Sequence, residues 1–176
     1  RSASFGADWI GRGRTTSAGL TVFHNSIKNK IDFVGIKYSN IDGTDTSRGL
    51  EVYVEQYLRP QLSLRGSYTF TDGDNLIDVP QNLAEGSIRF KKDALTTYLR
   101  AKWVGNHYAN IFNLDNFSMV KREEGGMFIV DLTTSFQVKN GVEVYLRIQN
   151  LFNEHYSVGG YREPGTTING GINCLF

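Results

Sequence analysis

The chain has a single cysteine, Cys174, and only 3 prolines among its 176 residues. One cysteine excludes an internal disulfide framework and a cysteine-rich metal site. The 19 basic side chains are balanced by 18 acidic ones, and this net charge of +1 argues against a nucleic-acid-binding surface. No apolar run approaches the roughly 18 residues of a membrane-spanning helix, so a helical membrane protein is excluded as well.

What the sequence does contain is an alternation of apolar and polar residues along most of its length. In GVEVYLRIQN, valine, leucine and isoleucine fall on one face, and Glu143, Tyr145, Arg147 and Gln149 fall on the other. Residues 49–58, 62–70 and 128–138 alternate in the same way. By this criterion the chain contains about nine β-strands.

The predicted strands are long, about nine to twelve residues, whereas strands of soluble proteins average about five or six. About ten residues at roughly 3.3 Å each, tilted by about 40°, rise about 25 Å, which is the height of the lipid-facing band of an outer-membrane barrel. The predicted fold class is therefore all-β, a transmembrane antiparallel β-barrel segment with its strands in up-and-down order.

The links between the strands support this class. The short polar links RGRT, LRPQ, KKDA and VKNG alternate with long ones near 73–81, 107–126 and 152–165. Outer-membrane barrels combine short periplasmic turns with long outer loops. If the short links are periplasmic, the first strand (about 3–11) and the last (about 166–176) run in the same direction, which makes the strand number odd. Single-chain bacterial barrels have even numbers, so we expect a fragment that lacks at least one strand on its N-terminal side.

Most aromatic residues lie near the ends of the predicted strands, where they suit girdles at the level of the lipid headgroups. These residues are Phe5, Trp9, Phe23, Phe33, Tyr57, Tyr68, Phe70, Phe90, Trp103, Phe136 and Phe176. The alternative is that they form the core of a soluble β-sandwich. Charged residues at alternate positions are predicted to form a polar ladder across the strands: Glu51, Glu55, Arg65, Arg89, Glu143 and Arg147.

Several segments, taken in order, resemble the barrels of TonB-dependent outer-membrane receptors. They are TVFHNSIKNKIDF, YSNIDGTDTSRGLEVYVE, SYTFTDGDN, IQNLFNEHY and GYREPGTTINGGINCLF. The resemblance implies a barrel of about 22 strands around a plug. Such a receptor, in the bacterial outer membrane, binds a siderophore, haem, vitamin B12 or a similar nutrient and imports it with energy from the TonB complex. Residues 1–176 would be the C-terminal part of the barrel, without the plug and the N-terminal strands. Thr166 and Cys174 depart from the family pattern, which usually has Arg and an aromatic residue there.

If this part of the receptor contacts a small-molecule or metal-chelate ligand, the contacts are expected in the long links. The aromatic and cationic candidates are Tyr108, Phe112, Phe117, Tyr156, Tyr161 and Arg162. The alternative is that these loops only pack on one another. His24, His107 and His155 have no second ligand at metal-binding spacing, so we expect loop or lumen histidines, no metal site and no cofactor. No nucleophile motif such as Gly-x-Ser-x-Gly occurs, so an enzyme is not expected.

The end of the chain, GGINCLF, is predicted to be the closing strand. Ile168, Ile172, Cys174 and Phe176 share a face that we expect to contact outer-membrane lipid. By resemblance, Ile172, Cys174 and Phe176 would form the signal that the barrel assembly machinery recognises. Two other classes stay open from the sequence: a self-standing outer-membrane barrel with an adhesive or structural role, and a soluble β-sandwich binding module.

Overall fold

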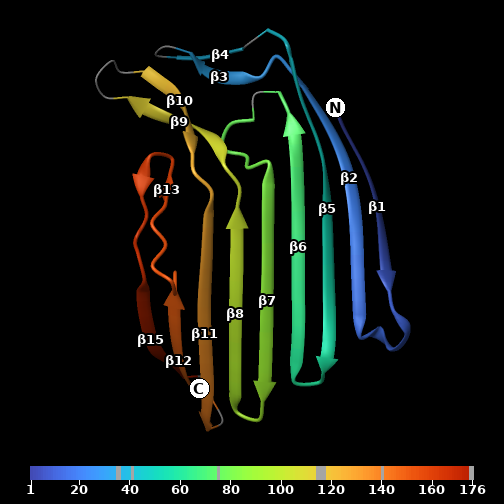
Figure 1. The fold of residues 1–176 in the computed structure, drawn as a ribbon, viewed down its shortest axis with the longest axis vertical. Coiled ribbons are helices and arrows are strands. Elements are labelled where there is room, and N and C mark those ends of the chain that lie inside the picture. The colour runs from blue at the N-terminus through green and yellow to red at the C-terminus, as the bar shows by residue number, and fades with distance from the viewer. Residues whose placement is uncertain (35–36, 41, 75, 114–117, 140, 175–176) are drawn as a thin grey trace.

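The computed structural model describes residues 1–174, apart from 35–36, 41, 75, 114–117 and 140. Within these residues, nine strands form one antiparallel sheet in the order β1-β2-β5-β6-β7-β8-β11-β12-β15. Their bounds are β1 (Ser2–Ile10), β2 (Thr16–Lys28), β5 (Thr44–Arg59), β6 (Leu62–Gly73), β7 (Asn82–Lys92), β8 (Leu95–Val104), β11 (Met127–Lys139), β12 (Val142–Gln149) and β15 (Thr167–Cys174). The up-and-down order and the strand number are as predicted. β1 and β15 form opposite edges, so the described sheet is open (Figure 1).

The remaining strands form small hairpins at one end of the large sheet (Figure 1). They are β3 (Ile31–Val34) with β4 (Lys37–Asn40), β9 (His107–Asn113) with β10 (Ser118–Glu124), and β13 (Ser157–Val158) with β14 (Tyr161–Arg162). Short turns occupy the other end, and one of them contains the 3-10 helix η1 (Arg12–Arg14). The predicted alternation of short and long links is confirmed. A further long link, residues 29–43, was not among the predicted ones. The Asn29 N–H donates to the Gly43 carbonyl at its base.

Among the described residues, none of the helical segments has the length and apolar character needed to span a membrane.

The register of the sheet separates an apolar face from a polar face. Leu50 lies directly opposite Val22 on β2 and Phe70 on β6, and on the other face Glu55 lies opposite Arg65. We call the face that carries Leu50 the apolar face and the one that carries Glu55 the polar face. Because side chains alternate between faces, each in-register pair extends the same face to the next strand.

The apolar face is uncovered. The only hydrophobic side chains buried within the described part of the chain are Val104, Ala109 and Val130, whereas Phe5 is 74% exposed and Ile172 65%. A β-sandwich would bury such a face against a second sheet. This arrangement contradicts the soluble-sandwich interpretation, and it has the exposed apolar surface that a lipid-facing sheet requires.

Two of the predicted girdle aromatics lie on the polar face instead. Phe23 lies opposite Gly49, and the Tyr57 hydroxyl donates to Glu55 Oε1 at 3.2 Å. Phe33 belongs to the β3–β4 hairpin, outside the large sheet, and Phe176 lies outside the described residues. The other predicted girdle aromatics, namely Phe5, Trp9, Tyr68, Phe70, Phe90, Trp103 and Phe136, are all on the apolar face.

The expectation that the histidines lie in loops or face the lumen is wrong for His24, which lies in neither a loop nor the polar face. Its position in β2 alternates with that of Thr21 and Phe23, which puts it on the apolar face opposite Arg48. Arg48 in turn pairs with Asp72 at 2.9 Å on the next strand. These polar groups lie toward the hairpin end of the apolar face, the level at which a membrane has its headgroups.

The polar face carries the predicted ladder of charged side chains. Besides the facing pair Glu55 and Arg65, Asn173 Nδ2 donates to Glu143 Oε1 at 3.2 Å. An ion pair of 2.7 Å between Arg100 and Glu85 also joins β8 to β7, and the pattern had not indicated either residue.

Three aromatic rings on the polar face lie opposite glycines of the neighbouring strand. The pairs are Tyr53 with Gly19, Phe23 with Gly49 and Tyr145 with Gly171. A Cβ atom at any of these glycines would overlap the facing ring. The Tyr53 hydroxyl continues across Gly19 and donates to Asp8 Oδ1 at 2.9 Å. Glycine therefore leaves room for a ring to cover the neighbouring backbone.

Gly49→Ala is expected to destabilise the folded barrel by about 1–3 kcal/mol, because the added methyl would overlap the Phe70 carbonyl oxygen and the Phe23 ring. Urea unfolding of the complete protein in lipid vesicles, followed by tryptophan fluorescence, measures this. Gly66→Ala is the matched control, since its Cβ would meet nothing closer than Val54 Cγ1 at 3.7 Å. Equal losses at the two positions would contradict the role given to the ring.

Candidate functional site

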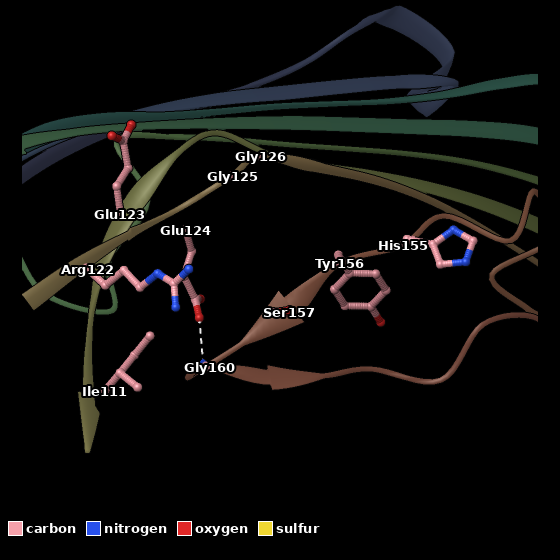
Figure 2. A pocket seen from close by; sticks show the side chains of 10 residues that line it. All are labelled: Ile111, Arg122, Glu123, Glu124, Gly125, Gly126, His155, Tyr156, Ser157 and Gly160. Atoms are coloured by element: carbon pink, nitrogen blue, oxygen red, sulfur yellow. Dashed lines mark hydrogen bonds between the residues drawn. The ribbon is translucent and has the colours of Figure 1, made fainter. Parts of the chain in front are cut away.

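The β9–β10 hairpin and residues 150–166 face each other at the hairpin end of the sheet and enclose a cavity of about 300 Å³ (Figure 2). We call it the loop cavity. The β9–β10 side contributes Arg122, Glu124 and Ile111, and the other side contributes His155 and Tyr156. The two sides belong to links that follow β8 and β12, so the sheet brings together loops that are distant in the sequence.

Glu124 lies at the contact between the two loops. Its side chain is 6% exposed, and its Oε1 accepts a hydrogen bond of 2.8 Å from the Gly160 N–H (Figure 2). Its Oε2 lies 3.5 Å from His107 Nε2 at the base of the same hairpin. Burial of a carboxylate is costly unless donors compensate it. The Gly160 N–H does so for Oε1, whereas Oε2 is buried and makes no hydrogen bond within the described residues.

Tyr156 borders the loop cavity and also a second cavity of about 380 Å³ that opens on the polar face. The second cavity is lined by Arg100, Lys102, Asp131 and Glu163, among others. Burial, together with the charges of Glu163 and Asp131, raises the pKa of the Tyr156 phenol above its ordinary value. The phenol therefore stays neutral at physiological pH and is able to donate a hydrogen bond.

Asn150 anchors residues 150–166 to the sheet. It is 3% exposed, and its Nδ2 donates to the carbonyls of Glu154 at 2.9 Å and Pro164 at 3.4 Å, while its Oδ1 accepts from the Glu154 N–H at 2.8 Å. Its own N–H donates to Asp131 Oδ1 at 2.9 Å, and its carbonyl accepts from the Thr166 hydroxyl at 2.7 Å. One side chain thus ties both ends of the loop together beside β11.

A third cavity, of about 260 Å³, lies between residues 73–81 and the β9–β10 hairpin. The Lys121 ammonium lies 4.4 Å from the centre of the Tyr108 ring, and both side chains border this cavity. The Asp78 N–H donates to the Tyr108 carbonyl at 2.7 Å, which joins the two loops.

The structure brings only some of the predicted ligand residues to these cavities. Tyr156 borders two of them and Tyr108, which is 46% exposed, borders the third. Tyr161 and Arg162 lie exposed on β14 and line none of the three. The backbone of Phe112 lies in β9 opposite Met119, and Phe117 lies outside the described residues.

The sequence did not indicate Arg122, Glu124, Asn150 or Glu163 as site residues. Glu124 meets Gly160 across 36 positions, so no local spacing reveals the contact. Asn150 is part of the segment IQNLFNEHY that carries the family resemblance, and this membership is the one signal that pointed toward it. In the part of the chain that the structure describes, no three His, Cys, Asp or Glu side chains are grouped to hold a metal ion.

The family model described as TonB dependent receptor-like, beta-barrel, matches residues 1–151. The ferripyoverdine receptor of the outer membrane of Pseudomonas aeruginosa superposes with a TM-score of 0.76 at 16% identity. The ferric-catecholate import receptor Fiu of E. coli K12 gives 0.72 at 19%, and the copper transporter OprC gives 0.79 at 14%.

These superpositions cover nearly all of this chain but a minor part of each solved structure. The shares are 98% of this chain and 26% of the ferripyoverdine receptor, 99% and 27% for Fiu, and 99% and 32% for OprC. The chain therefore spans about a quarter to a third of the length of these proteins, and at such low identities the likeness concerns the fold.

Proposed function

Since the chain belongs to the family of TonB-dependent receptor-like β-barrels, whose barrels lie in the bacterial outer membrane, we propose that it is the C-terminal part of a receptor that imports a scarce nutrient. The observation that carries the proposal is the open sheet with an uncovered apolar face. Its edge strands β1 and β15 need partners, because an unpaired edge is not viable in lipid. Further barrel strands would supply these partners, and a plug would fill the lumen and link the receptor to TonB.

The substrate that we propose is a metal chelate, with a ferric siderophore as the first candidate. Of the ligand classes that the resemblance implies, this one is supported by the names of the ferripyoverdine and ferric-catecholate receptors. Arg122 and the neutral phenol of Tyr156 line the loop cavity, and each can donate a hydrogen bond to an oxygen of a chelate, while Glu123 and Glu124 line it as well, so the cavity has no net positive charge. Family and neighbours are receptors and transporters, so no catalytic step is proposed.

We also propose that Tyr108, Tyr156, Tyr161 and Arg162 contact the ligand, together with Phe112 of β9 and with Phe117. Tyr161 is 79% exposed, which leaves its ring free to cover an incoming ligand. The packing alternative assigns these side chains only to contacts between loops.

We also propose that Ile172 and Cys174, near the C-terminal end of the chain, belong to the signal that the barrel assembly machinery recognises. Both lie on the apolar face of β15, opposite Val144 and Val142, and both are exposed. Phe176, the terminal member of the signal, lies outside the described residues.

The proposed function is tested by growth of a strain that lacks the gene, under iron limitation, on a panel of purified ferric siderophores. We expect loss of growth on at least one of them, restored by the intact gene only when TonB is present. Growth on every chelate without the gene would favour the alternative of a self-standing barrel with an adhesive or structural role.

Tyr156→Phe is expected to weaken binding of that siderophore to the complete receptor by about five- to tenfold, because one hydrogen bond from the phenol is lost. Equilibrium binding by intrinsic fluorescence quenching measures the change. Tyr57→Phe, which removes a phenol near the short-turn end of the sheet, is the matched control and should leave the affinity unchanged. Unaltered affinity in the Tyr156 variant would favour the packing alternative for this residue.

A further inference from the structure

The Glu124 carboxylate connects two loops that leave the sheet at different places. Glu124 ends β10, and Gly160 lies at the turn between β13 and β14. The 2.8 Å bond from the Gly160 N–H to Oε1 spans 36 positions, and the side chain that accepts it is 6% exposed. A buried, charge-assisted bond of this kind is stronger than an exposed neutral one, so it is suited to hold two loops together.

The backbone at Gly160 is shaped for this contact. Gly160 has φ of 84°, a conformation that L-residues rarely adopt. A Cβ atom there would lie 2.9 Å from Ile111 Cγ2, so the turn packs directly on β9. The hairpin therefore meets its neighbour through both a hydrogen bond and close packing.

The second carboxylate oxygen faces the base of the β9–β10 hairpin. Oε2 lies 3.5 Å from His107 Nε2, and His107 begins β9, with two residues between it and the end of β8. The His107 ring is itself held near the Gly105 carbonyl, with Nδ1 at 3.4 Å. Glu124 thus lies between the base of one loop and the tip of the other.

We propose that Glu124 is a positioning residue that couples the β9–β10 hairpin to the β13–β14 hairpin, so that the two loops move as one body. In a chain in which each loop leaves the sheet on its own, independent motion is the default. The shared carboxylate removes this independence. The loop cavity between the hairpins consequently keeps a fixed shape as long as the bond from Gly160 is intact.

Amide hydrogen exchange in the complete receptor in lipid tests the coupling. Glu124→Ala is expected to speed exchange in residues 157–162 at least tenfold, while residues 142–149 keep their protection. Glu124→Gln retains an oxygen that accepts from the Gly160 N–H, and it should restore most of the protection. Glu123→Ala is the matched control, because Glu123 is exposed and its contact at 3.4 Å is with Asn106; it should leave residues 157–162 unchanged.

A distance measurement gives a second readout of the same coupling. Nitroxides at Lys121 and Val158, in a Cys174→Ser background, should give a narrow distance distribution that Glu124→Ala broadens and Glu124→Gln keeps narrow. If Glu124→Ala does not fold, Glu124→Asp replaces it, since its shorter side chain should withdraw the carboxylate from Gly160 without removing the charge. Unchanged exchange and distances in the Ala or Asp variant would overturn the proposal, and so would a Gln variant that behaves like Ala.

Discussion

Replacing Asn150 by alanine is expected to lower the free energy of unfolding of the complete barrel by about 3 kcal/mol. The reason is the number of backbone groups that depend on this one side chain. It satisfies the N–H and the carbonyl of Glu154 and also the carbonyl of Pro164. Because Asn150 is 3% exposed, water does not readily replace these bonds, and each unsatisfied buried group costs about 1–3 kcal/mol.

The backbone at Asn150 adds to the cost. Its φ is 52°, in the left-handed region that Asn tolerates and Ala disfavours by about 1–2 kcal/mol. Asn150→Gly removes this strain and should therefore be less harmful than Asn150→Ala. Asn150→Asp keeps the acceptor for the Glu154 N–H but turns a carboxylate oxygen toward the carbonyls of Glu154 and Pro164, so it should also destabilise.

Urea unfolding in lipid vesicles measures all three variants, with Asn169→Ala as the control because Asn169 is exposed on β15. Limited proteolysis of residues 150–166 shows whether the loop is released before the barrel unfolds. A loss at Asn150→Ala no larger than that of Asn169→Ala would refute the anchoring role.

The sheet was predictable because its side-chain period is two. A register slip of one residue would turn every apolar side chain to the wrong face, so alternation such as that of residues 141–150 determines both strand and facing. The lengths of the links then separate the two ends of the sheet. The hairpin within residues 29–43 escaped this reasoning because its strands, β3 and β4, are only four residues each, too short for a clear period.

The positions of individual aromatics were less predictable. A ring near a strand end suits a headgroup girdle, but it suits equally well a place opposite a glycine on the next strand. Phe23 lies opposite a glycine, because Gly49 faces it across the β2–β5 pair. That outcome depends on which residues are paired across strands, and pairing follows from the register of the whole sheet rather than from the local sequence.

The candidate site was predictable only as a region. We expected ligand contacts in the long links, and two residues named on that basis, Tyr156 and Tyr108, border cavities. The same reasoning did not identify Glu124, because a glutamate before Gly125 and Gly126 in the sequence is expected to be an exposed side chain at a turn. Its buried carboxylate accepts from the Gly160 N–H, a contact between loops that only the folded sheet brings together.

Leu146→Arg is expected to destabilise the barrel in lipid by about 2–4 kcal/mol. Leu146 lies on the apolar face near the middle of β12, opposite Thr134 and Gly170, and it is 40% exposed. If this face contacts lipid, an arginine here must hold its charge near the bilayer midplane, where water and headgroups are out of reach. The cost should fall toward the strand end, so Val142→Arg, beside the short turn, is expected to cost about 0–1 kcal/mol.

The comparison of these two positions separates membrane depth from packing. Both replace an aliphatic residue by arginine on the same face of the same strand, so a general effect of the larger side chain would be similar at each. Arg147→Lys, on the polar face, keeps the charge and should change stability little. Refolding into lipid vesicles followed by denaturant titration measures the series. Equal costs at 142 and 146 would mean that the apolar face does not meet the bilayer, because only a lipid environment makes the penalty for a charge depend on its height along the strand.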